Sequence, residues 1–249
     1  MDIIFKNYEN PTYQLKFGGY FLPMDHYEIE ANKEYYNNVV YKNEISDFVI
    51  SSNDNISYCD EAEIITKINI NNEKYFDFNK SIIDIGANVG IYSFRTNFNK
   101  VYAFEPNKIM YNFLNFNLMI FDKYLSSEVY NVCLSDKNEV IEFDGFNTDQ
   151  HLMNKNNIEK IYTHTLDEYN CEDVGLIKVD VEGMEEKVLR GGLGTIIRNN
   201  YPPILFECWG IIDDFSKNRH DLLEKLLIEL GYDILWGWGN FQTHLAIHK

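Results

Sequence analysis

The feature that most constrains the fold is a ten-residue stretch, SIIDIGANVG, at residues 81–90. Its first five residues are apolar or small apart from Asp84, and glycines follow at positions 86 and 90 with Asn88 between them. The apolar residues after the second glycine have a spacing suited to the start of a helix. The pattern predicts a buried parallel strand, a tight glycine turn and a helix N-terminus. In open α/β sheets, such a turn at the end of a first strand binds nucleotide-like ligands.

A second predicted strand, residues 100–104, leads into Glu105 and Pro106. Glu105 follows the glycine turn by roughly 20 residues, which is the spacing at which an acid meets ribose hydroxyls in Rossmann-like folds. A charge at the N-terminal end of the next helix is an alternative role for Glu105, and the two roles are compatible.

The glycine turn itself indicates the kind of nucleotide. The dinucleotide fingerprint G-x-G-x-x-G needs a glycine where this chain has Asn88, and that glycine makes room for a pyrophosphate. S-adenosylmethionine contains adenosine but no phosphate, so it does not need that glycine. An acid beside the turn, Asp84, also suits a cationic ligand better than an anionic one by Coulomb attraction.

Composition excludes several classes of function. The formal net charge is -17, which disfavours binding to a phosphate backbone, so we expect no nucleic-acid partner. The four cysteines form no C-x-x-C pair, as expected for a reduced, intracellular protein without a structural zinc. No apolar run approaches the ~20 residues of a membrane span, and the N-terminus lacks a signal-peptide core. We therefore expect a cytoplasmic protein without a membrane partner.

Strand and helix patterns alternate along the chain, so the predicted fold is α/β with a mostly parallel sheet. Helices are expected at 61–70, 107–121, 184–190 and 216–230, further strands at 128–134, 175–180 and 202–207, and a short strand at 161–164. In the last helix, the residues expected to face the core are Leu222, Leu223, Leu226, Leu227 and Leu230. The last two strands, 232–236 and 241–247, are joined by too few residues for a crossover helix and must be antiparallel. A seven-stranded, mostly parallel sheet with an antiparallel C-terminal hairpin is the Rossmann-like fold of class I methyltransferases.

The N-terminal segment differs from the rest of the chain. Residues 1–58 are irregular and aromatic, and they suggest short strands that form a small β-rich cap over one end of the sheet. We therefore divide the chain into this cap segment, 1–58, and a methyltransferase-like domain, 59–249.

Five blocks of sequence, in this order and spacing, resemble the FkbM family of methyltransferases. They are IDIGANVG at 83–90, AFEPN at 103–107, VCLSD at 132–136, TLD at 165–167 and IKVDVEG at 177–183. The resemblance runs from about residue 60 to about residue 210. It implies a Rossmann-like fold, S-adenosyl-L-methionine as methyl donor, and a hydroxyl acceptor on a sugar, a glycan or another small metabolite.

The positions of these blocks predict a donor site at the ends of the first three strands. Glu105 is expected to bind the ribose hydroxyls, Asp84 to anchor the turn or the donor's ammonium group, and the segment after the third strand to lie along the adenine. Each of these side chains could instead only cap the end of a strand. The predicted donor-binding residues are Asp84, Gly86, Asn88, Gly90, Glu105, Leu134, Ser135 and Asp136.

The candidates for the chemistry are three acids that end strands or begin the turns after them, Asp180, Glu182 and Glu207, and one loop histidine, His151. A carboxylate near the transferred methyl group would accept the hydroxyl proton, which is general-base catalysis. The same acids could hold Mg²⁺, which prefers oxygen ligands, but we assign no residue as a metal ligand. His151 could instead be a solvated surface group.

Two other classes of function remain open at this point. One is another nucleotide-binding α/β enzyme, such as an NAD-dependent oxidoreductase, and the other is a catalytically inactive binding module. The missing second glycine disfavours the first, and the acids at three strand ends disfavour the second. We expect a small-molecule or glycan substrate and a possible homo-oligomer.

Overall fold

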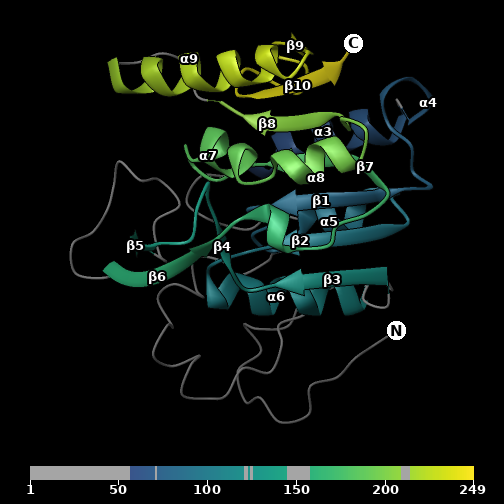
Figure 1. The fold of residues 1–249 in the computed structure, drawn as a ribbon. Helices are drawn as coiled ribbons and strands as arrows, with labels where there is room; N and C mark the ends of the chain where they lie inside the picture. Colours follow the sequence, from purple (N-terminus) through teal and green to yellow (C-terminus); the bar gives the residue numbers. More distant parts are fainter. Residues whose placement is uncertain (1–56, 71, 121–122, 124–125, 145–157, 209–213) are drawn as a thin grey trace, which may run out of the picture.

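The computed structural model describes residues 57–70, 72–120, 123, 126–144, 158–208 and 214–249 (Figure 1). Seven strands form the main sheet in the order β3-β2-β1-β7-β8-β10-β9. They are β1 (Ser81–Ile85), β2 (Lys100–Phe104), β3 (Ser127–Tyr130), β7 (Val174–Val179), β8 (Ile204–Glu207), β9 (Tyr232–Leu235) and β10 (Thr243–His248). The first five are parallel to one another, and β10 is antiparallel to both β8 and β9. The predicted sheet and its antiparallel C-terminal hairpin are therefore confirmed.

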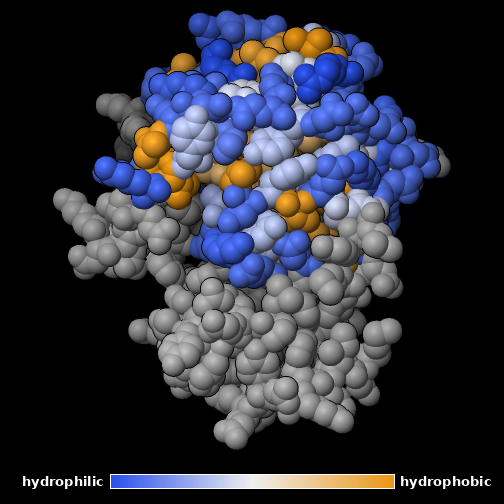
Figure 2. Space-filling model, turned by 60° about the horizontal axis from the view of Figure 1, so that its bottom comes forward, coloured by the Kyte–Doolittle hydropathy of each residue, from blue (hydrophilic) through white to orange (hydrophobic). Residues whose placement is uncertain are grey.

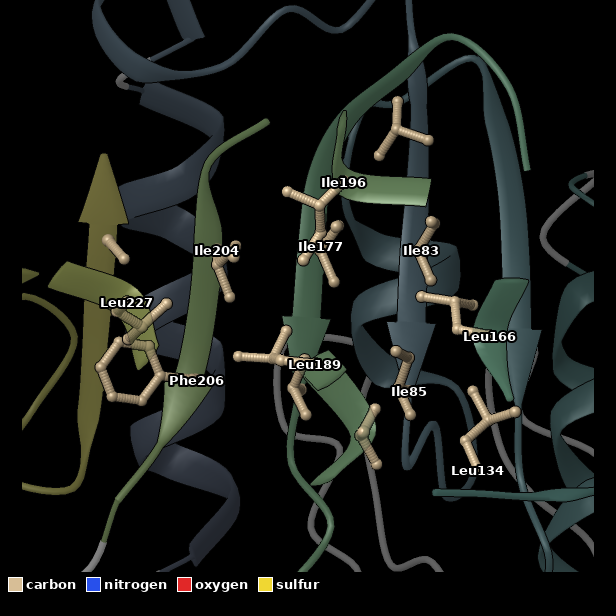
Figure 3. Packing of buried hydrophobic residues seen from close by; sticks show 14 of the residues in the cluster. Ile83, Ile85, Leu134, Leu166, Ile177, Leu189, Ile196, Ile204, Phe206 and Leu227 are labelled. Atoms are coloured by element: carbon tan, nitrogen blue, oxygen red, sulfur yellow. The ribbon is translucent and has the colours of Figure 1, made fainter. Parts of the chain in front are cut away.

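Helices cover both faces of this sheet, as the fully buried central strands β1 and β7 require. One face carries α3 (Ser57–Ile70), α5 (Ile91–Arg95) and α6 (Lys108–Ile120), whose buried side chains form one core with Ile82 and Val101. The other face carries α7 (Glu185–Arg190), α8 (Leu193–Arg198) and α9 (Asp214–Glu229), which form a second core with alternate residues of the same strands. Figure 3 shows this second core, in which Ile83, Ile177 and Phe206 from three strands face Leu189 and Leu227 from two helices.

One expected side-chain position in α9 was wrong. The leucine spacing predicted that Leu222 would face the core with Leu223, Leu226 and Leu227, but Leu222 is 40% exposed. Leu223, Leu226 and Leu227 already fill the stripe toward the sheet, and Leu222 lies at its edge. Gly231, in the left-handed region at φ 85°, then ends the helix.

The third strand, predicted at 128–134, is confirmed as β3, but its predicted end was wrong because the chain turns after Tyr130. Residues after β3 leave the main sheet, and β4 (Cys133–Leu134) pairs with β6 (Ile158–His164) in a separate three-stranded sheet with β5 (Val140–Asp144). The side chain of Asn131 donates hydrogen bonds to the carbonyl oxygens of Glu105 and Pro106, both 2.9 Å away, and so fixes this turn. Two short elements, α4 (Asn72–Tyr75) and the 3-10 helix η4 (Leu166–Glu168), complete the described structure.

The division at residue 58 stays a prediction. The expected cap lies almost entirely in residues 1–56, outside the described residues, whereas α3 starts at Ser57 and packs Ile64, Ile65 and Ile68 into the core. Of the described helices, none combines the length and apolarity that a membrane-spanning segment requires. In Figure 2, the described residues on the side facing the viewer form a mainly hydrophilic surface with small, separate hydrophobic areas.

Candidate functional site

The glycine turn after β1 lies against the end of β7. Gly86 has φ +68°, and a Cβ atom on it would lie 1.8 Å from the carbonyl oxygen of Asp180. Only glycine fits such a close approach in a left-handed conformation. The glycine turn of the predicted donor site therefore contacts Asp180, the first of the predicted catalytic acids.

The rest of the turn is held by side chains from α6 and β2. Gly90, at φ +88°, packs against Leu114 of α6, and the side-chain amide of Asn117 donates to the carbonyl of Val89 over 2.7 Å. Asn88 is itself left-handed at φ 52°. Its backbone N–H donates to Oε2 of Glu105 over 2.8 Å. The three predicted turn residues thus form one braced loop at the carboxyl edge of the sheet.

Glu105 joins this loop to the start of α6. Its Oε1 accepts the backbone N–H of Asn107 at 2.7 Å, while Asn107 caps the helix by accepting the N–H of Met110. The side chain is only 6% exposed, and burial raises the pKa of Glu105 to about 7 although both backbone N–H bonds act in the opposite direction. Each carboxylate oxygen has a second lone pair, so the pair of oxygens can still accept two hydroxyl donors.

Asp84 has a structural environment beneath the turn. It is fully buried, its Oδ2 accepts the hydroxyl of Ser93 at 2.6 Å, and its Oδ1 lies 3.3 Å from Nζ of Lys178. Lys178 is the positive partner in this buried pair, so the charge of Asp84 is compensated within the protein. Asp84 therefore supports the turn. Because its charge is already paired, it favours a cationic ligand less than the sequence alone suggested.

Lys178 links the donor turn to the acids. Its Nζ donates to the carbonyl oxygen of Gly86 over 2.7 Å and lies 3.5 Å from Oδ2 of Asp180. Lys178 therefore contacts two carboxylates, those of Asp84 and Asp180. The ammonium also lies 5.3 Å from the centre of the Tyr92 ring, a cation–π contact.

The three predicted acids come together at the carboxyl ends of β7 and β8. One oxygen from each of Asp180, Glu182 and Glu207 lies within 4.8 Å of the others. Burial, the two neighbouring carboxylates and a hydrogen bond with Asp180 raise the pKa of Glu207 to about 10. The raised pKa favours the protonated form of Glu207, so Asp180 and Glu182 are the better candidates for a base. Three carboxylates at this spacing could also hold a divalent cation.

Two residues of this site were missed in the sequence analysis. Glu185 is the first residue of α7, just after the turn that contains Glu182. Arg219 belongs to α9, more than 30 residues later. Both contact the Glu182 turn, which we define as residues 181–184. An acid at the first position of α7 was a visible clue, but the approach of Arg219 depends on helix packing.

The segment after β3 is more deeply buried than expected. The side chain of Leu134 packs in the core, and Ser135 is fully buried, with its N–H donating to the carbonyl of His164. Asp136 is exposed. Burial and the nearby Glu105 carboxylate raise the pKa of the Cys133 thiol to about 11. The role of Leu134, Ser135 and Asp136 at the adenine stays a prediction, and His151 lies outside the described residues.

A comparison with family models gives one match for this region. The model of the methyltransferase FkbM domain matches residues 84–234, which include β1, the Glu182 turn and α9. No curated protein sequence matches the chain.

A solved methyltransferase structure shares the fold. An FkbM methyltransferase from Methylobacillus flagellatus KT superposes with a TM-score of 0.53 at 17% identity over 89% of this chain, and the chain spans 60% of that protein's length. A SAM-dependent O-methyltransferase from Thermotoga maritima gives a TM-score of 0.45 at 12% identity, with 74% of this chain and 64% of the other covered.

Proposed function

Because the chain belongs to the FkbM family of methyltransferases, we propose that it transfers a methyl group from S-adenosyl-L-methionine to a hydroxyl of a sugar, a glycan or another small metabolite. The observation that carries this proposal is the contact between the glycine turn and the acid cluster. Gly86 packs on the backbone of Asp180, and Asp180, Glu182 and Glu207 gather there. A ligand held at the turn would therefore lie beside carboxylates. Membership of a methyltransferase family disfavours the alternative of an NAD-dependent oxidoreductase.

The donor side of the proposal uses residues that directly follow β1 and β2. Glu105 would accept the two ribose hydroxyls, and the loop of Gly86, Asn88 and Gly90 would lie under the donor. The adenine would lie along the segment that starts at Cys133. The donor supplies an activated methyl group on a sulfonium sulfur.

On the acceptor side, the carboxylates of Asp180 and Glu182 would stabilise the positive charge that develops on the acceptor oxygen during transfer. As the new O–C bond forms and the C–S bond breaks, the bonding electrons return to sulfur and the acceptor oxygen becomes positive. Asp180 or Glu182 would take the hydroxyl proton, and general-base help of this kind contributes ~10²–10⁴-fold. Alignment of the reacting groups can contribute as much as ~7–11 kcal/mol, so loss of the base should slow the enzyme without silencing it.

The donor assignment is tested by calorimetry with S-adenosylhomocysteine and, as a competitor, NAD. We expect binding of the first only, and the Glu105→Ala variant should lose ~1.5–3 kcal/mol of binding free energy because the lost hydrogen bonds involve a charged acceptor. Unchanged affinity in this variant would remove Glu105 from the site. Preferential NAD binding would overturn the donor assignment itself.

The chemistry is tested with Asp180→Asn and Glu182→Gln, which keep side-chain size and remove charge. If either acid is the base, single-turnover methyl transfer should fall at least ~10-fold while donor affinity changes less than ~3-fold, since a group acting in the transition state affects rate more than ground-state binding. If the acids hold a metal, a chelator should abolish activity of the unmutated protein and Mg²⁺ should restore it. If they only cap a helix, the variants should lose ~1 kcal/mol of stability and keep full turnover.

The acceptor is found by mass spectrometry of candidate glycans and metabolites incubated with protein and donor. A gain of one methyl group on one of them would identify the acceptor class. If no candidate gains a methyl group although S-adenosylhomocysteine binds, the chain would be a binding module.

A further inference from the structure

The Glu182 turn has a backbone conformation that needs support. Glu182 has φ 54° and Gly183 has φ 101°, so two consecutive residues are left-handed, and the first of them is not a glycine. A side chain in this region is unfavourable unless the surrounding structure holds it there. The turn also sets the direction in which the Glu182 carboxylate leaves the backbone.

Part of that support comes from Glu185 at the start of α7. Its Oε1 accepts the backbone N–H of Val181 at 3.2 Å and that of Gly183 at 2.9 Å. The side chain is buried, so these two bonds replace the water that the turn's N–H groups would otherwise need. Glu185 therefore closes the turn from the helix side.

The other part comes from Arg219 on α9. A Cβ atom on Gly183 would lie 1.4 Å from Nη2 of Arg219, so the guanidinium fills the space that a side chain at this position would take. The same Nη2 lies 3.8 Å from Oε2 of Glu185, and the Arg219 side chain is only 24% exposed. Figure 1 shows α9 and α7 as separate helices on the same face of the sheet, so this contact joins elements that are distant in sequence.

We propose that Arg219 is a positioning residue: its guanidinium, packed on Gly183 and paired with Glu185, holds the Glu182 turn so that the Glu182 carboxylate joins the acid cluster. Arg219 acts through Glu182, so its effect on catalysis rests on the function proposed above. A planar cation suits this place because it can lie against a glycine and face a carboxylate at its edge.

The first test needs no acceptor. In ¹⁵N-labelled protein, the Arg219→Met variant should exchange the Val181 and Gly183 amide hydrogens at least ~10-fold faster than the unmutated protein, with the amides of β7 unchanged, because only the local support is lost. Arg219→Lys should recover part of the protection through its charge. Lys217→Met serves as the matched control, since it removes a cation from the same helix that pairs with Asp221 at the surface.

The second test measures catalysis with the acceptor that gains a methyl group in the mass-spectrometric screen. Arg219→Met should lower kcat at least ~10-fold and leave both the acceptor KM and the affinity for S-adenosylhomocysteine within ~3-fold. Arg219→Lys should be intermediate, and Lys217→Met should match the unmutated protein. A variant that merely loosened α9 would not lower kcat selectively while leaving KM and donor affinity unchanged.

A double-mutant cycle tests whether Arg219 acts through Gly183. Gly183→Ala should displace the guanidinium, so adding Arg219→Met to it should change amide exchange by less than ~2-fold, because the interaction is already lost. If the two substitutions instead speed amide exchange by independent factors that multiply, Arg219 does not act through Gly183. Unchanged amide exchange in Arg219→Met would overturn the positioning role whether or not the protein methylates anything.

The kinetic arm separates the two proposals. If Glu182→Gln keeps full turnover, the catalytic role of Glu182 fails and Arg219 has nothing to position, even where amide exchange is faster. If Glu182→Gln is slow but Arg219→Met is not, the proposed function stands and the inference about Arg219 is overturned.

Discussion

The ammonium nitrogen of Lys178 lies 2.7 Å from the carbonyl oxygen of Gly86. The lysine belongs to β7, the strand that leads into Asp180, and the glycine belongs to the turn expected to hold the donor. Because the same ammonium pairs with Asp84 and Asp180, one buried cation connects the two halves of the site. The position of the donor turn relative to the acids therefore depends on a side chain that need not touch either substrate.

Replacing Lys178 with methionine should be strongly destabilising. The change leaves the fully buried Asp84 without its counter-charge, and breaking a buried pair from one side costs ~3–5 kcal/mol. Urea unfolding would measure the loss. Adding Asp84→Asn should recover part of it, since the remaining group is then neutral. Lys100→Met, which breaks an exposed pair with Glu128, should cost at most ~1 kcal/mol, and an equal loss in both single variants would contradict this account.

Donor binding should weaken as the pH falls below about 7. Burial raises the pKa of Glu105 to about 7, so roughly nine-tenths of the groups are protonated at pH 6 and can no longer accept two hydroxyl hydrogens. Calorimetry should give a dissociation constant for S-adenosylhomocysteine up to ~10-fold larger at pH 6 than at pH 8. The Glu105→Gln variant should bind more weakly, and its affinity should be flat over this range.

The same group has the opposite effect on the stability of the donor-free protein. A folded pKa raised above the unfolded value gives stability that is present below about 4.5 and is lost as the pH rises through about 7. Glu105→Gln should therefore show less decline in unfolding free energy between pH 5 and pH 8 than the unmutated protein. Parallel curves for the two proteins would show that the burial of Glu105 has no such cost.

Glu207 should behave as a neutral acid at neutral pH. Because burial and the neighbouring carboxylates raise its pKa to about 10, the folded protein keeps a proton that the unfolded chain releases above about pH 4.5, and the resulting stability is lost as the pH rises toward 10. Glu207→Gln imitates the neutral form, so its stability relative to the unmutated protein should improve steadily from pH 5 to pH 9. Its turnover at pH 7 should stay within ~3-fold, whereas a loss as large as that of Asp180→Asn would make Glu207 the base.

Gly86→Ala should disrupt the donor site more than its backbone strain alone explains. Gly237 has nearly the same φ, +67°, but the nearest atom to a Cβ there is 3.6 Å away, so Gly237→Ala measures the cost of the left-handed conformation, ~1–2 kcal/mol. At Gly86 the added methyl group also collides with the Asp180 carbonyl, which should cost a further ~1–3 kcal/mol and weaken S-adenosylhomocysteine binding at least ~10-fold. Thermal melts and calorimetry on both variants test this, and equal behaviour would mean that the turn moves freely away from β7.

Nucleic acid should not bind. The net charge of -17 opposes a phosphate backbone. A fluorescence titration with random-sequence DNA and RNA at low salt should give no binding tighter than ~1 μM. Tighter binding that disappears as salt rises would show that a basic surface outweighs the net charge.

Local sequence patterns determined most of the fold. The apolar run before Gly86, the spacing to Glu105, and the short link between β9 and β10 each restrict the chain over a few neighbouring residues. The mostly parallel sheet and its antiparallel hairpin could therefore be inferred from them. The N-cap at Asn107 and the glycine at 231 that ends α9 are equally local, since a cap acts within one helical turn.

Only the tertiary structure decided how the site is built. Four features join residues from different elements: the turn at Asn131 that sends β4 into a second sheet, the approach of Asp180 and Glu182 that raises the pKa of Glu207, the pairing of Lys178 with Asp84, and the contact of Arg219 with Gly183. Hydrogen bonding, burial and charge pairing of this kind depend on distances in space that sequence spacing does not specify. The sequence alone therefore determined which residues stand at the ends of the strands. Packing decided how their pKa values shift, which hydrogen bonds hold them and which of them contact one another.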